Sequence, residues 1–161
     1  MLNLPKNKIK LIASDFDGVL TDCGLYITSD GGSLKKLCYK DIMGVSCWLK
    51  QGGKFAIISG DKSVMIDVFA TKLNIEDVFQ GVHFSQKKEM LESLMSKYNL
   101  SSEEVCYVGD DINDIESLEL AGVAVCPCDA NYKVKEINDI IISDKKGGEG
   151  VIREITDSLM D

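Results

Sequence analysis

Asp15 and Asp17 stand two positions apart, directly after a short apolar run near the start of the chain, and Asp110 and Asp111 follow a later apolar run. Carboxylate oxygens are the ligands that Mg²⁺ prefers, and one or two of them usually hold the ion together with waters and a phosphate. A metal ion would also let Asp15 approach a phosphate dianion that it would otherwise repel. The spacing therefore predicts a magnesium site formed by Asp15 and Asp110.

These acidic residues must be brought together by the elements that carry them. Five apolar runs of strand length alternate with helical periodicities, which predicts an α/β fold, a Rossmann-like parallel sheet with helices on both faces. Ligands bind at the carboxyl ends of the strands in such a sheet. The first three runs end near Asp15, Ser59 and Asp110, so we expect these residues to share one crevice. The runs cover residues 9–13, 55–58, 105–108, 123–125 and 140–142.

Two apolar stripes with helical spacing are expected to pack against this sheet. A third helix is expected to end at Gly52 and Gly53, because glycine accepts the left-handed conformation that closes a helix. The stripes are Val64, Met65, Val68, Phe69 and Leu73, and then Met90, Leu91, Leu94, Met95 and Tyr98.

A flap of two strands is predicted at about residues 24–39. The apolar segments 25–27 and 34–39 flank residues 28–32, whose aspartate and glycines suit a hairpin turn. We expect the whole chain, residues 1–161, to form a single domain, because a chain of this length buries one sizeable core.

Four short motifs resemble, in their order, those of the haloacid dehalogenase superfamily. One such motif would be weak evidence, whereas four at the predicted ends of strands and helices are a strong signal. The resemblance implies an enzyme, a phosphatase that depends on Mg²⁺. Lys88 is adjacent to the third motif, and the spacing to Gly109 in the resembled family favours Lys87. The motifs are residues 15–18 (Asp-Phe-Asp-Gly), Ser59, Lys87 and residues 109–114 (Gly-Asp-Asp-Ile-Asn-Asp).

The resemblance implies a catalytic role for four of these residues. Asp15 attacks phosphorus and forms an aspartyl phosphate, which divides one difficult displacement into two easier steps. Asp17 protonates the leaving oxygen and then deprotonates the water that hydrolyses the intermediate. Ser59 hydrogen-bonds the phosphoryl oxygens, and Lys87 neutralises the charge that develops on them.

The resemblance also implies the set of metal ligands. Mg²⁺ is held by the carboxylates of Asp15 and Asp110 and by the backbone carbonyl of Asp17. Asp111 and Asp114 are expected behind these ligands, where they orient the metal waters and the lysine.

The gaps between the motifs are too short for a cap domain, since 43 residues separate Asp15 from Ser59 and 27 separate Ser59 from Lys87. With its flap and the tail at residues 147–154, the chain resembles the 3-deoxy-D-manno-octulosonate 8-phosphate phosphatase group. That resemblance implies a phosphorylated sugar acid as substrate, and a homotetramer in which the flaps meet and a neighbour's tail reaches the active site. Arg153 is either a contact of the substrate carboxylate or a surface helix residue.

The residues near the predicted phosphate site leave the sugar open. Asp61 stands where the octulosonate enzymes usually have arginine. Phosphatases of nine-carbon keto-sugar acid 9-phosphates tend to have an acidic residue there and a lysine eleven positions later, which Lys72 matches, but Phe69 replaces one of their arginines. The substrate is therefore an eight-carbon or a nine-carbon acid. The candidate substrate contacts are Gly60, Asp61, Lys72, Asn113 and Arg153.

Three other classes of protein fit the sequence less well. Similar domains fused to cytidylyltransferases support assembly without catalysis, but every motif residue is present here, which favours an enzyme. A signalling receiver domain would carry its acceptor aspartate after the third strand instead of the first. A calcium loop would need an oxygen ligand where Val19 stands and a glutamate where Tyr26 stands.

Charge and composition restrict the partners. The net charge of −8 would repel the phosphates of nucleic acid, so no nucleic-acid partner is expected. No run of about 18 apolar residues occurs, so neither a membrane span nor a leader is expected. The six cysteines are expected to be reduced thiols, which fits a cytoplasmic protein.

Overall fold

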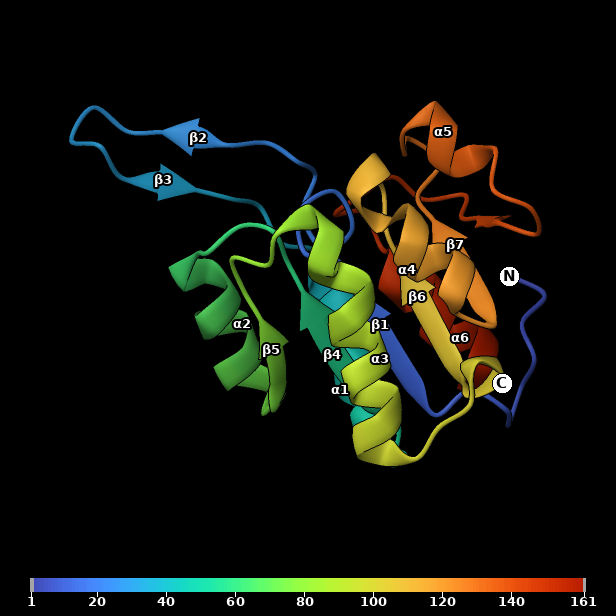
Figure 1. The fold of residues 1–161 in the computed structure, drawn as a ribbon. Helices are drawn as coiled ribbons and strands as arrows, with labels where there is room; N and C mark the ends of the chain where they lie inside the picture. Colours follow the sequence, from blue (N-terminus) through green and yellow to red (C-terminus); the bar gives the residue numbers. More distant parts are fainter. Residues whose placement is uncertain (1, 161) are drawn as a thin grey trace.

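A computed structural model describes residues 2–160, and its centre is one parallel sheet of six strands. The strands lie side by side in the order β5-β4-β1-β6-β7-β8, while β2 and β3 form a separate antiparallel hairpin (Figure 1). The predicted α/β fold with a parallel sheet is confirmed, and no cap domain is present in residues 2–160. The strands are β1 (Leu11–Ser14), β2 (Tyr26–Ile27), β3 (Ser33–Leu34), β4 (Lys54–Ile58), β5 (Asp77–Phe79), β6 (Val105–Val108), β7 (Val123–Cys126) and β8 (Ile141–Ile142).

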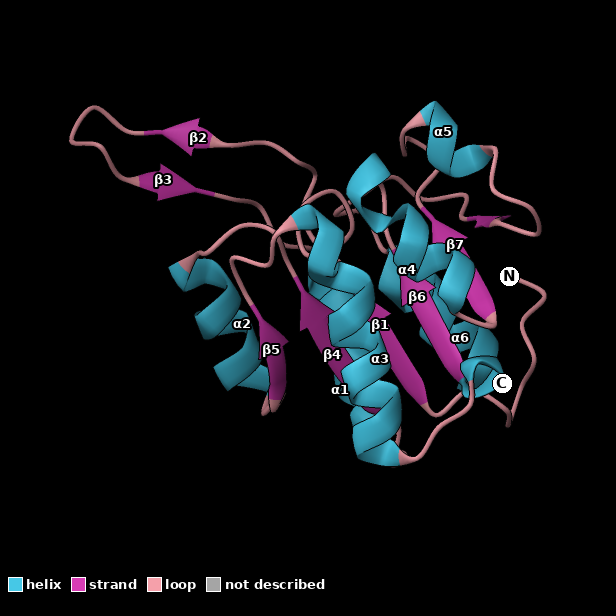
Figure 2. Ribbon diagram, viewed as in Figure 1, coloured by secondary structure: helices cyan, strands magenta, loops and turns pink. Residues whose placement is uncertain are grey.

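Helices cover both faces of the sheet (Figure 2). Successive side chains of a strand point to opposite faces. In β1, Ile12 packs with buried residues of α1, α2 and α6, whereas Leu11 and Ala13 pack with those of α3, α4 and α5. The helices are α1 (Tyr39–Lys50), α2 (Val64–Leu73), α3 (Lys87–Tyr98), α4 (Ile115–Leu120), α5 (Tyr132–Lys135) and α6 (Val151–Met160).

All five predicted strands are present, and the structure adds β5 at one edge of the sheet. This strand has three residues and begins with a charged one, so it lacks the apolar run by which the others were recognised. The carboxylate of Asp77 is buried there because Lys97 and the Tyr98 hydroxyl, both at the end of α3, donate hydrogen bonds to it. The glycine pair ends α1 as predicted, with Gly52 at a φ of +87°.

The predicted packing face of α2 is partly wrong. Phe69 is buried as predicted, but Val64 and Val68 are exposed, and the helix buries Ile66 and Ala70 in their place. Apolar residues occur nearly all around this short helix, so their periodicity alone did not identify the buried side. The two exposed valines lie on the surface that faces the hairpin, where they line a cavity together with Leu25.

The hairpin of β2 and β3 extends away from the body of the molecule (Figure 1). Its predicted second arm, residues 34–39, is wrong beyond the first residue. β3 ends at Leu34, Leu37 forms a single bridge to Thr21, and Tyr39 already begins α1. Directly after Leu34, the ammonium of Lys35 meets two carboxylates, those of Asp17 and Asp61.

None of the helices in residues 2–160 combines the length and the apolar character that crossing a membrane requires. All six cysteines are free thiols, as expected.

Candidate active site

Asp15 leaves the carboxyl end of β1 in the middle of the sheet. Its backbone N–H donates to the carbonyl of Val108 in β6 over 2.9 Å, and its Oδ1 accepts a hydrogen bond of 2.6 Å from the N–H of Phe16. β4 and β6 flank β1, and they end immediately before Ser59 and two residues before Asp110. The parallel sheet thus brings these three strand ends to one edge.

Lys87 is the cation of this site. It is the first residue of α3, is fully buried, and places its Nζ 2.6 Å from Asp15 Oδ2 and 2.9 Å from Asp114 Oδ1. Burial alone would lower the pKa of this ammonium, but the charges of Asp114 and Asp15 outweigh it and raise the pKa. Lys88 is only half-buried, so Lys87 is the lysine that faces Asp15.

Asp114 fixes that lysine. It is fully buried, and its Oδ1 also accepts a hydrogen bond of 2.8 Å from the hydroxyl of Tyr107. Its Oδ2 accepts from the backbone N–H of Asp110 over 3.2 Å. Asp111 has a different environment, because its exposed side chain caps the turn and accepts a hydrogen bond of 2.8 Å from Asn131.

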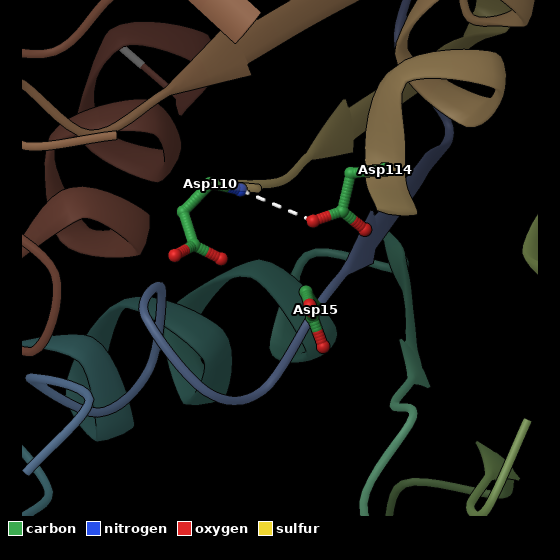
Figure 3. A group of neighbouring side chains, drawn as sticks. All are labelled: Asp15, Asp110 and Asp114. Atoms are coloured by element: carbon green, nitrogen blue, oxygen red, sulfur yellow. Dashed lines mark hydrogen bonds between the residues drawn. The ribbon is translucent and has the colours of Figure 1, made fainter. Parts of the chain in front are cut away.

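Three carboxylates crowd around the lysine. Asp15, Asp110 and Asp114 each have an oxygen within 4.8 Å of the others (Figure 3). Burial first, and then the negative charges of Asp114 and Asp111, raise the pKa of Asp110 to about 7. Burial and Asp114 also raise the pKa of Asp15. The carboxylates exceed the single ammonium in charge, and a bound divalent cation would relieve that excess.

The backbone beside Asp110 leaves room for such an ion. Gly18 has a φ of +80°, and a Cβ at this position would lie 2.0 Å from Asp110 Oδ2. Only glycine therefore lets the Asp17–Gly18 backbone approach this carboxylate. Asp15 and Asp110 stand at the strand ends next to this backbone, so their carboxylates and the carbonyl of Asp17 are suited to hold Mg²⁺, whereas the fully buried Asp114 holds Lys87.

Both carboxylate oxygens of Asp17 are occupied. Oδ1 accepts a hydrogen bond of 3.1 Å from the hydroxyl of Thr21, and Oδ2 accepts one of 2.7 Å from Lys35 Nζ. Lys35 also donates to Asp61 over 2.7 Å. Sequence reasoning missed Lys35, and the only available signal was a basic residue at the base of the predicted flap.

The predicted catalytic residue Ser59 and the predicted substrate contacts Gly60, Asp61 and Lys72 lie on the loop after β4 and on α2. Ser59 is buried and its Oγ accepts from the N–H of Asp61 over 3.2 Å, which leaves its own O–H able to donate. Gly60 is exposed beside it. Lys72, at the other end of α2, places its Nζ 5.8 Å from the centre of the Tyr39 ring, while Asp61 pairs with Lys35.

Asn113 and Arg153 lie on different elements. Asn113 is in the turn before α4, and its side-chain oxygen is buried without a hydrogen-bond partner in residues 2–160. Arg153, on α6, pairs with Asp157 at 2.7 Å and lines a small cavity with Lys40 and Lys145. None of the residues around Lys87 lines that cavity.

The tail packs against its own chain. A Cβ on Gly147 would lie 2.1 Å from the carbonyl oxygen of Gly18, and the N–H of Gly148 donates to the carbonyl of Val19 over 2.9 Å. Asp41 in α1 then accepts hydrogen bonds from the N–H groups at the start of α6. The tail thus supports the loop that carries Asp17 within a single subunit.

Comparison with known proteins shows the family of this chain. Residues 81–155 match the model of the haloacid dehalogenase-like hydrolase family. Octulosonate 8-phosphate phosphatases from Salmonella typhi and Escherichia coli K12 are 33% identical over 94% of this chain and 79% of their own length. The chain belongs to the haloacid dehalogenase-like hydrolase family.

Solved structures of related phosphatases are also similar to this chain. A probable YrbI family phosphatase from Pseudomonas syringae has a TM-score of 0.89 at 35% identity, over 95% of this chain and 85% of that one. The octulosonate 8-phosphate phosphatase of Moraxella catarrhalis, solved with magnesium, phosphate and KDO, has a TM-score of 0.89 at 30% identity, over 95% and 86%. The chain is a phosphatase of this hydrolase family.

Proposed function

We propose that this phosphatase hydrolyses the phosphate monoester of a 2-keto-3-deoxy sugar acid through an aspartyl phosphate on Asp15. The observation that carries the proposal is the buried Asp15 carboxylate, which Lys87 holds at 2.6 Å beside Asp110 at the end of the central strand. Mg²⁺ bound there would neutralise the phosphoryl oxygens and the carboxylates together.

Each step of the proposed reaction depends on particular residues of this chain. Asp15 attacks phosphorus while Asp17 gives a proton to the leaving sugar oxygen. Lys87 and the Ser59 hydroxyl stabilise the charge on the phosphoryl oxygens during transfer. Asp17, now ionised, takes a proton from the water that attacks the aspartyl phosphate, which releases phosphate and restores Asp15. Asp114 keeps Lys87 in place throughout.

The relatives favour an eight-carbon acid, because they are named as 3-deoxy-D-manno-octulosonate 8-phosphate phosphatases. Asp61 is the observation that keeps a nine-carbon acid open. This aspartate stands where the octulosonate enzymes usually have arginine, and its carboxylate pairs with Lys35.

A panel of phosphorylated sugar acids tests the proposal. We expect release of phosphate from octulosonate 8-phosphate in the presence of Mg²⁺, and a lower kcat/KM for the nine-carbon 9-phosphate and for simple sugar phosphates. The Asp15→Asn variant serves as the blank. Activity equal to the blank on every member would refute the proposal, while a preference for the nine-carbon acid would change only the substrate.

Mg²⁺ affinity provides a second test, through its dependence on pH. Asp110 must be ionised to bind the ion, and its pKa in the metal-free protein is about 7. Protons therefore compete with Mg²⁺ below that pH, and the raised pKa of Asp15 acts in the same direction. We expect the Kd for Mg²⁺ in calorimetry to weaken about tenfold per unit as the pH falls below 7. An affinity independent of pH would exclude Asp110 as a ligand.

The hairpin supports assembly as a homotetramer. Leu25, Tyr26, Ile27 and Leu34 expose between 55% and 74% of their surface, although two-stranded hairpins are marginal in water without partner contacts. We expect light scattering to give about four times the chain mass of 17.7 kDa, and the exposed pair Tyr26→Ser and Ile27→Ser to reduce it. A monomeric wild-type protein would refute the assembly.

A further inference from the structure

The base of the hairpin touches the residue assigned to proton transfer. Lys35 directly follows β3, and only 11% of its side chain is exposed, although both residues of β3 are exposed. Its Nζ lies 2.7 Å from Asp17 Oδ2 and 2.7 Å from Asp61 Oδ2. One ammonium thus joins the hairpin, the loop after β1 and the loop after β4.

Lys35 and Thr21 hold Asp17 from two sides. The Thr21 hydroxyl donates to Oδ1, and the same hydroxyl accepts from the backbone N–H groups of Gly18 and Cys23. Thr21 is fully buried, so its position is set by the loop itself. Lys35 supplies the second donor, and it is the one that depends on where the hairpin lies.

Lys35 also lines a cavity at the base of the hairpin. A cavity of about 850 Å³ lies between the hairpin and the start of α2, with Lys35, Asp61 and Ser63 in its lining. The leaving group must lie on the Asp17 side of the phosphorus, because that carboxyl protonates the leaving oxygen. Lys35, which donates to Oδ2 of Asp17, is thus also one of the residues that line this cavity.

We propose that Lys35 is a positioning residue that orients the Asp17 carboxyl toward the leaving oxygen, and so couples the hairpin to proton transfer. The inference rests on the proposed aspartyl-phosphate mechanism. Without Lys35, Oδ2 of Asp17 loses its donor, and the carboxyl group can rotate while Oδ1 stays hydrogen-bonded to Thr21. The two steps that use Asp17 then slow, namely protonation of the leaving oxygen and deprotonation of the attacking water, whereas attack by Asp15 on an ester whose leaving group needs no proton does not.

Two leaving groups separate these effects. An alkyl phosphate, such as the sugar acid phosphate hydrolysed best, needs a proton on its leaving oxygen, whereas p-nitrophenolate departs without one. Since general acid catalysis contributes roughly 10²–10⁴-fold, we expect Lys35→Met to lower kcat/KM, which reports the steps up to departure of the leaving group, about tenfold or more on the alkyl phosphate and less than about threefold on p-nitrophenyl phosphate. Lys35→Arg, which keeps donors for Asp17, should recover part of the alkyl rate.

Lys36 provides the matched control. It is the next residue on the same arm, is 53% exposed and pairs with Asp22, so Lys36→Met should leave both rates near wild type. Equal losses on both substrates in Lys35→Met and in the smaller change Lys35→Gln would show a merely structural role, and unchanged rates would also overturn the inference. Wild-type rates no higher than those of Asp15→Asn would instead refute the proposed function, and the inference with it.

Discussion

Replacement of Asp15 by asparagine is expected to abolish phosphatase activity. The amide keeps the size of the side chain and an oxygen for the Phe16 N–H, but it is no nucleophile toward phosphorus. Loss of a nucleophile that acts together with its partners typically costs roughly 10⁴-fold or more in kcat. Initial rates of phosphate release at saturating Mg²⁺ would measure the loss. Acid-quenched wild-type enzyme should also carry protein-bound phosphate that the variant lacks.

An exposed aspartate offers the control for this change. Asp67 lies on α2 and accepts a hydrogen bond from Gln80, away from the strand ends that carry the site. Asp67→Asn should retain wild-type activity. An Asp15→Asn enzyme that keeps more than about a tenth of the wild-type rate, or that still forms the phosphoprotein, would contradict the assignment of Asp15 as nucleophile.

The sequence predicted the central sheet because parallel strands are buried on both faces and so read as continuous apolar runs. Val105–Val108 is such a run, and its predicted bounds agree with β6. The convergence of Asp15 with Asp110 follows from the same property, since the ends of neighbouring parallel strands meet. The resemblance to a known family singled out Lys87, and the structure places its ammonium against Asp15.

The contact of Lys35 with Asp17 could not be predicted in this way. It joins residues 18 positions apart through two side chains, and neither helical nor strand periodicity reports such a contact. The packing of Gly147 against the carbonyl of Gly18 is similar, because a close approach of two backbones leaves only a glycine in the sequence as its sign. Such contacts depend on how loops fold over the sheet.

Replacement of Lys87 by methionine is expected to have the largest effect on stability and to abolish activity. Methionine replaces the apolar stem of the lysine, but it leaves the buried carboxylates of Asp15 and Asp114 without their shared ammonium. Removal of one partner from a buried ion pair costs about 3–5 kcal/mol in the free energy of unfolding. We expect a loss of about 3 kcal/mol in urea denaturation above neutral pH, and no measurable phosphate release.

The pH dependence distinguishes this cause from a simple packing defect. Without the ammonium, the pKa of Asp15 rises further in the folded variant, while in the unfolded chain it returns to its ordinary value. The folded variant then binds protons more tightly than the unfolded chain, so its stability is present at low pH and is lost as the pH rises. The destabilisation relative to wild type should therefore shrink as the pH is lowered toward 5.

The neighbouring change Lys88→Met should stay within about 0.5 kcal/mol of wild type at every pH. A Lys87→Met protein as stable as Lys88→Met above neutral pH would show that Lys87 does not compensate these carboxylates, and the charge balance of the proposed site would fail with it.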